Sequence, residues 1–195
     1  MYIIKYSGPF GFIKPWTAVR DSETFSQQFL TPSIIEGIEK KLFPELLNEI
    51  GIKRIKRHRL SYCGIYIQQE MTLSKGLDYK DIPFQKGKSK IKGKRKSIIK
   101  RGVMLKPILH IAFENKDEAE TALTQTICLA RNEDIMFPIE MFEADENALD
   151  QIDGFELIFT PPEDGFKVGH NRFDKSSEMF GDLKVFGNPI REDHE

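Results

Sequence analysis

The feature that most constrains the fold of this chain is an apolar stripe between Phe25 and Phe43. Thr31 is a favoured helix N-cap, and Pro32 suits the first helical position because its missing N–H would have no partner there. The spacing that follows places four apolar side chains on one helical face: Ile34, Ile35, Ile38 and Leu42. The stretch therefore predicts an amphipathic helix laid on a sheet, with its charged residues in solvent: Glu36, Glu39, Lys40 and Lys41.

The composition is that of a globular protein. At 195 residues, with 39% hydrophobic and 30% charged residues, the chain is long enough to bury a core. No apolar run approaches the ~20 residues of a membrane span, and the start lacks a signal-peptide pattern. Cys63 and Cys128 lie far apart in apolar surroundings and are expected to be buried free thiols. These features predict a cytoplasmic protein with no membrane partner.

The distribution of charge is strongly asymmetric. Residues 1–106 contain 22 Lys and Arg against 9 Asp and Glu, while residues 107–195 contain 7 against 21. A basic half of this kind indicates a polyanionic partner. The alternative is that the two halves neutralise each other across the fold.

The order of predicted elements indicates the fold class. Strands are predicted at Tyr2–Tyr6, Ile52–Leu73, Gly102–Glu114, Ile135–Phe142 and Phe155–Thr160, and a second helix at Asp117–Arg131. The two longest strands can pair. A bulge is expected near Gly64, and Pro107 marks a bulge or an edge. The class is therefore α+β, with a ferredoxin-like βαββαβ core. We expect this domain at residues 1–160 and a loop-rich extension at 161–195, with one short strand at Leu183–Phe186.

A basic insertion at residues 74–101 separates the second and third strands of that core. Nine of the sixteen residues from Lys86 to Arg101 are basic and none is acidic. A segment so charged cannot bury itself, so we expect a mobile loop or hairpin that orders on an anion; the alternative is a solvated loop. The candidate RNA contacts here are Lys86, Lys88, Lys90, Lys92, Lys94, Arg95, Lys96, Lys100 and Arg101.

A second candidate contact lies in the broken stretch between the first strand and the first helix. Lys14, Trp16 and Arg20 bring cations and an aromatic plane together, the combination that holds single-stranded RNA. The alternative for Trp16 is core packing. In a ferredoxin-like fold this stretch should pass close to the N-terminal end of the first helix, whose free N–H groups favour anions.

Residues 1–135 resemble a known family. The strand Tyr2–Tyr6, the crossing Gly8–Trp16, the helix start Thr31–Ile38 and a strand pair split by a basic insertion are similar to the CRISPR-associated RAMP superfamily, in particular its Cas-five branch. The resemblance implies a crRNA-binding subunit of a type I CRISPR surveillance complex (Cascade) that holds the five-prime handle. The implied partners are the crRNA and the backbone and large Cascade subunits.

The chain also departs from the family. Phe137–Phe142 stands where many relatives carry a Leu-Gly-x-Arg-x-Cys type of segment, and the glycine-rich loop typical of RAMP proteins is not recognisable in the last third. The RNP1 signature of RNA-recognition modules is absent as well. These departures indicate a divergent or minimal member.

The resemblance also bears on catalysis. Some Cas-five proteins cut repeat RNA with a tyrosine at the end of the first helix and a Lys-His pair before the second. The matching positions here are Phe43 and Glu114–Glu118, which contain no tyrosine or histidine for proton transfer. We therefore expect a non-catalytic protein. The alternatives are a metal-independent endoribonuclease that uses His58 or Tyr62, or a protein-interaction module with a basic docking loop.

The sequence contains no recognisable motif for binding a metal or a cofactor. The four histidines show no H-x-x-x-H spacing, and the two cysteines form no C-x-x-C pair. No phosphate-binding loop, dinucleotide fingerprint or nucleophile elbow is present. We expect no metal site and no cofactor.

Overall fold

The computed structural model describes residues 1–18, 22–72 and 97–192. Its main sheet is built from β1 (Tyr2–Ser7), β4 (Ile55–Ser61), β7 (Ile108–Phe113), β8 (Ile127–Cys128), β9 (Ile135–Glu143), β10 (Gly154–Phe159), β11 (Phe166–His170) and β12 (Glu178–Phe186). A second sheet contains β2 (Phe10–Gly11), β3 (Glu23–Phe25), β5 (Gly64–Thr72) and β6 (Ser97–Leu105). The helices are α1 (Pro32–Leu42), α2 (Lys116–Leu123) and α3 (Glu146–Asp150), with 3-10 turns at Pro44–Leu46 and Pro162–Asp164.

The main sheet runs in the order β11-β12-β10-β4-β7-β1-β9-β8. Its strands pair antiparallel, as in the β1 pairings of Tyr2 with Phe113 and Glu143. In chain order α1 joins the β1 region to β4, and α2 lies between β7 and β9. The α+β class predicted from the sequence is therefore confirmed.

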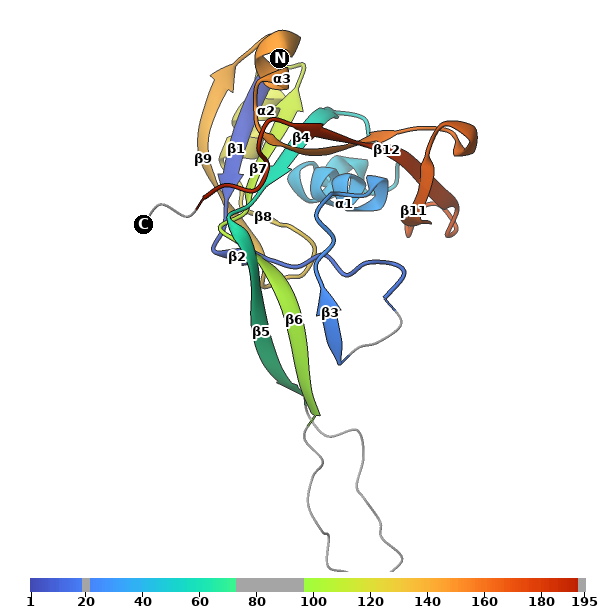
Figure 1. Cartoon of the computed structure of the whole chain (residues 1–195). Coiled ribbons are helices and arrows are strands. Elements are labelled where there is room, and N and C mark those ends of the chain that lie inside the picture. The colour runs from blue at the N-terminus through green and yellow to red at the C-terminus, as the bar shows by residue number, and fades with distance from the viewer. Residues whose placement is uncertain (19–21, 73–96, 193–195) are drawn as a thin grey trace, which may run out of the picture.

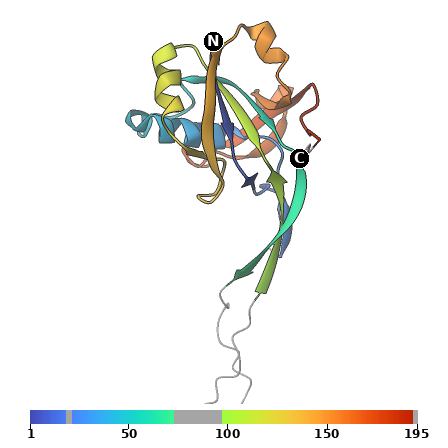
Figure 2. The ribbon, with the colours of Figure 1, turned by 90° about the vertical axis from the view of Figure 1, so that its left-hand side faces the viewer.

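The two long predicted strands do pair, but each is divided between the two sheets. β4 pairs with β7 in the main sheet, whereas β5 pairs with β6 from Gly64–Leu105 to Thr72–Ser97. The breaks fall near Gly64 and Pro107, where the sequence predicted irregularity. Lys106 has φ 44°, a left-handed conformation that turns the chain between the sheets. As a result the β5–β6 ribbon projects away from the main sheet (Figures 1 and 2).

Helix α1 begins at Pro32 and buries Ile35, Ile38 and Leu42, as predicted. These side chains share one core with the inner face of the sheet and with Ala119 and Ala122 of α2. Helical periodicity is sufficient to specify this face.

The prediction that the charged residues of α1 face solvent is wrong for Glu36, Glu39 and Lys40, which are buried. Glu39 accepts hydrogen bonds from the backbone N–H groups of Lys53–Ile55, at N–O distances from 2.5 to 3.1 Å. Glu36 accepts from the ammonium of Lys40 at 2.8 Å and from the backbone N–H of Gly51 at 3.0 Å. These carboxylates are buried because they satisfy the loop that enters β4.

The second helix is shorter than predicted. The sequence predicted helix to Arg131, but α2 ends at Leu123 and the chain continues into β8. Ile127 pairs with Met136 of β9 and is fully buried there. Ile127 was predicted to lie on the inner face of a helix, but its apolar side chain is buried from a strand instead.

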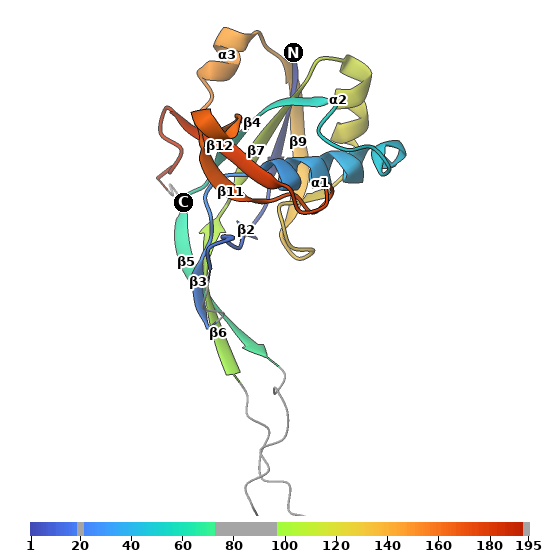
Figure 3. The same cartoon turned by 90° about the vertical axis from the view of Figure 1, so that its right-hand side faces the viewer.

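The prediction of mostly loop after residue 161 is wrong. β11 and β12 extend the main sheet beyond β10, and the short strand predicted at Leu183–Phe186 is the end of β12. Leu157, Val168 and Met179 form a small second core beneath these strands. β11 lies beside the start of α1 (Figure 3).

Two other sequence expectations are tested by burial and helix length. Cys63 and Cys128 are free, as expected, but both are partly exposed rather than buried. Among the described residues, no helix is long and apolar enough to span a membrane.

Candidate nucleic-acid interface

The segment between β1 and β3 is fixed next to the entry into α1. The backbone N–H of Ile13 donates to the Ser26 hydroxyl at 2.9 Å, and the backbone N–H of Gln27 donates to the Ile13 carbonyl at 2.8 Å. Ile13 and Lys14 line the same hollow as Ser33 at the first turn of α1. The prediction that this crossing passes the N-terminal end of the helix is confirmed.

One hollow along the crossing has a volume of about 580 Å³ and is bounded by α1, β6 and the loop after β8. Five cations contribute to its lining: Lys14, Lys41, Arg101, Arg131 and Arg172. They come from five separate segments of the chain. Tertiary folding therefore brings together a positive surface that no single segment carries.

Two smaller hollows continue this surface along the crossing. One, of about 210 Å³, shares Lys14 and Arg172 with the first, and another, of about 460 Å³, shares Trp16 and Gln27 with the second. We call the three hollows together the basic groove. No Asp or Glu is among the described residues that line them.

The groove cations differ in how far they are already neutralised. Arg101 pairs with Glu70 at 3.1 Å, and Arg131 pairs with Asp134 at 2.7 Å and with Glu70 at 2.9 Å. Burial is the largest single effect and lowers the pKa of Arg131, but the hydrogen bonds to Asp134 and the charges of Asp134, Glu133 and Glu70 together raise that pKa above its usual value. Both guanidinium groups are held in place beside the Phe12 ring, at 5.0 and 5.1 Å.

Lys41 and Arg172 form the freer part of the groove. Both are exposed, and neither is within ion-pair distance of a carboxylate in the described part of the chain. Arg172 crosses α1 at Gly37, where a Cβ would collide with its guanidinium. The missing side chain of Gly37 thus makes room for the Arg172 side chain.

Trp16 is 48% exposed, so the core-packing alternative for this residue does not hold. Its ring lies 5.3 Å from the ammonium of Lys167 and 6.2 Å from the ring of His170, both on β11. An aromatic plane and a cation are therefore adjacent at one end of the groove.

The remaining predicted contacts divide into two sets. Lys100 and Arg101 lie on β6, so the predicted loop gives way to strand from Ser97 onward; Lys100 is exposed and Arg101 lines the groove. The others lie outside the described residues: Arg20, Lys86, Lys88, Lys90, Lys92, Lys94, Arg95 and Lys96.

The alternative catalytic residues are both buried in β4 or directly after it. His58 is 3% exposed, and burial lowers its pKa to about 4 even though Glu156 opposes the shift. Tyr62 is 1% exposed, stacks on Phe155 at 6.2 Å between ring centres, and has its pKa raised by burial. Neither side chain reaches solvent, where an RNA hydroxyl would have to lie.

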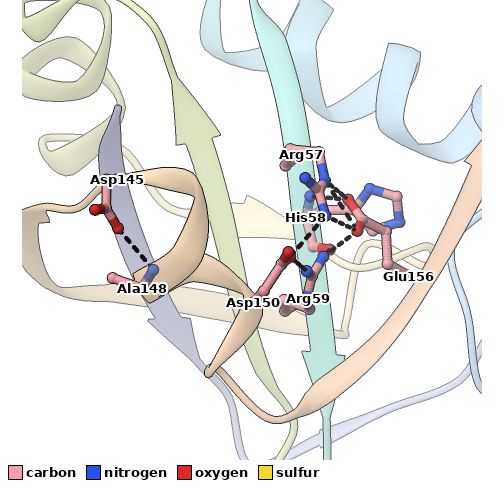
Figure 4. A network of polar contacts seen from close by, with 7 residues as sticks. All are labelled: Arg57, His58, Arg59, Asp145, Ala148, Asp150 and Glu156. Carbon is pink, nitrogen blue, oxygen red and sulfur yellow. Dashed lines mark hydrogen bonds and ion pairs between the residues drawn. The ribbon is translucent and has the colours of Figure 1, made fainter. Parts of the chain in front are cut away.

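The surroundings of His58 consist of a buried ion-pair network (Figure 4). Glu156 accepts from the Arg57 guanidinium at 2.8 to 3.0 Å and also contacts the fully buried Arg59. Arg59 reaches Asp150 at 2.8 Å and lies 3.5 Å from the centre of the Phe186 ring. These contacts tie β4 to β10, α3 and β12, which is a structural role.

Four groove cations were missed by the sequence analysis: Lys41, Arg131, Lys167 and Arg172. The sequence did contain a feature that points to three of these cations: Arg131, Lys167 and Arg172. Residues 107–195 contain only seven Lys and Arg, and three of these line the groove.

Comparison with known proteins supports the fold. No family model matches the chain, and no curated protein matches it either. Among solved structures, a chain of a "CRISPR RNA-guided surveillance complex" is similar with a TM-score of 0.55 and 10% identity, over 96% of this chain and 90% of that one. A chain of the "Type III-B Cmr-beta bound to cognate target RNA and AMPPnP" has a TM-score of 0.50 and 9% identity, over 96% and 84%. At such identities the likeness is one of fold.

Proposed function

We propose that this protein is a non-catalytic crRNA-binding subunit of a type I CRISPR surveillance complex, and that the basic groove holds the five-prime handle. The observation that carries the proposal is the clustering of six cations, Lys167 included, along three adjoining hollows with no carboxylate in the described lining. Single-stranded RNA offers a chain of phosphates that such a groove neutralises.

The arrangement of the central strands supports a ferredoxin-like core. β4, β7, β1 and β9 lie side by side in this order, and α1 and α2 fall between strands as a βαββαβ order requires. The β5–β6 ribbon then borders the basic insertion predicted at 74–101, of which the structure describes residues 97–101. The CRISPR complexes to which this fold is similar include RNA-bound assemblies, which is consistent with crRNA and further subunits as partners.

The non-catalytic part of the proposal rests on the matched positions. Phe43 packs at 5.9 Å from the ring of Phe113 and has no proton to transfer. Glu114–Glu118 supplies no histidine. His58 and Tyr62 are buried, so the alternative endoribonuclease would need the main sheet to open before RNA could reach them.

Incubation of the protein with labelled CRISPR repeat RNA in EDTA tests the proposal. We expect a mobility shift without cleavage, and competition by repeat RNA that exceeds competition by duplex DNA. Cleavage that disappears in a His58→Ala or Tyr62→Phe variant would favour the endoribonuclease. Absence of any shift, with the protein folded by circular dichroism, would favour the protein-interaction module instead.

A further inference from the structure

We propose that the hollow beneath Trp16 and Phe166 is a pocket for one unstacked RNA base. The inference rests on the proposed function, because it assigns a role to one end of the same groove. The hollow has a volume of about 460 Å³, within the ~300–1,000 Å³ range of small-ligand sites. We refer to it as the base pocket.

The walls of the base pocket present two aromatic rings from distant parts of the chain. Trp16 is 48% exposed and Phe166 is 46% exposed, and both line the same hollow. Behind them Phe29 holds the Phe166 ring edge-to-face at 6.0 Å. Large aromatic surface in solvent is costly, whereas a nucleobase placed against such rings contributes stacking energy.

The rim of the pocket carries groups suited to a base edge. The amide nitrogen of Gln27 donates to the Phe29 carbonyl at 2.9 Å, and the amide oxygen of Gln27 is an acceptor that this bond does not use. Gln28 and Thr17 are exposed on the same rim. A planar heterocycle with donors and acceptors at its edge matches these groups better than an aliphatic side chain does.

The position of the pocket relative to the cations also favours a base. Lys167 lies 5.3 Å from the Trp16 ring while its ammonium pairs with Glu178, so it is held at the pocket edge. The neighbouring hollow shares Trp16 and Gln27 and leads to Lys14 and Arg172. A strand whose phosphates follow these cations passes the pocket mouth, where one base can turn inward.

The chain contains a single tryptophan, and Trp16 lines the base pocket and the neighbouring hollow, so its fluorescence reports on this end of the groove. We expect single-stranded RNA to quench Trp16 emission. An oligomer of abasic ribose-phosphate units, with the same charge and no bases, should leave the emission unchanged. RNA binding is followed in parallel by the anisotropy of a label on the oligomer.

The variant Phe166→Ala removes one wall. We expect it to weaken RNA binding by about 5- to 150-fold, the range found when one stacking aromatic is removed, and to leave binding of the abasic oligomer unchanged. Phe137→Ala is the matched control, because Phe137 is 51% exposed on β9 and lines none of the three hollows. Thermal unfolding of each variant checks that the fold is retained.

The outcomes separate the two proposals. RNA that binds without quenching Trp16, together with equal affinities for Phe166→Ala and Phe137→Ala, overturns the base pocket and leaves the RNA-binding function standing. Equal affinity of the wild-type protein for RNA and for the abasic oligomer also overturns the base pocket and leaves the RNA-binding function standing. Loss of all RNA binding in the wild-type protein overturns the function first and the pocket with it.

Discussion

Neutralising the groove cations Lys41 and Arg172 should change how RNA affinity depends on salt. In the double variant Lys41→Gln/Arg172→Gln, two charges are removed that no described carboxylate balances. Arg101 and Arg131, by contrast, already share their charge with Glu70 and Asp134. The double variant therefore tests, with only two substitutions, whether the groove binds RNA phosphates.

The magnitude follows from counterion release. Each phosphate contact on a single strand contributes about 0.7 log units of affinity per log unit of salt. Two lost contacts should flatten the slope by about 1.4, which makes binding about 25-fold weaker near 0.1 M salt and almost unchanged near 1 M. Stability should change by less than about 0.5 kcal/mol, because both side chains are exposed.

Fluorescence anisotropy of labelled single-stranded RNA, titrated over a range of potassium chloride concentrations, gives the slope. The control is Lys53→Gln/Lys116→Gln, which removes the same charge from exposed sites outside the groove. If the two double variants flatten the slope equally, only overall charge matters and the groove is not the contact. A slope that stays at the wild-type value in the Lys41→Gln/Arg172→Gln variant refutes the assignment directly.

Three further substitutions test other parts of the argument. Gly37→Ala should raise stability by about 0.5–1 kcal/mol through helix propensity but weaken RNA binding, because its Cβ displaces a groove guanidinium; an unchanged affinity in the anisotropy assay would contradict this. Burial lowers the pKa of His58 from 6.5 to about 4. Between these two pH values His58 is protonated in the unfolded chain but not in the folded protein, so the free energy of unfolding decreases as the pH falls from about 6.5 to about 4. The wild-type protein should lose on the order of 3 kcal/mol of unfolding free energy between pH 7 and pH 4 through this residue, and His58→Phe should abolish that loss in urea unfolding measurements. A pH profile that His58→Phe leaves unaltered would count against this. Glu156→Gln leaves Arg59 buried without its carboxylate, so chemical denaturation should show a loss of about 3–5 kcal/mol; a loss below about 1 kcal/mol would mean that Asp150 suffices.

Much of the fold was predictable because its signals are local. Helix α1 follows from its period and from Pro32, and the strand breaks follow from Gly64 and Pro107. The burial of Glu39 was not predictable, because its partners are N–H groups of a loop more than ten residues later. The end of α2 was missed for a similar reason: Ile127 fits a helix face but gains a strand partner in β9.

The candidate interface was predictable only in part. Lys14, Trp16 and Arg101 were chosen from the sequence and line the basic groove. Lys41 was assigned to the solvent side of its helix, which is correct, but nothing local says that this side borders a groove. Arg172 depends on the β11–β12 connection, in a region where sequence analysis predicted loop.

The sequence analysis offered two interpretations of the charge asymmetry: a polyanionic partner, or mutual neutralisation of the two halves of the chain. Each interpretation applies to a different set of cations. Along β1 and the segment leading into and through β4, cations of the first half pair with carboxylates of the second half: Lys5, Arg54, Lys56, Arg57 and Arg59. A polyanion that bound there would have to break those pairs, and at Arg59 it would have to reach a fully buried group. At the basic groove it would meet Lys41 and Arg172, two exposed charges that no described carboxylate neutralises. Because exposed contacts are screened by salt more than buried pairs are, RNA should dissociate at salt concentrations that leave the melting temperature almost unchanged. A melting temperature that falls in step with RNA release would mean that the two sets of cations are not separate.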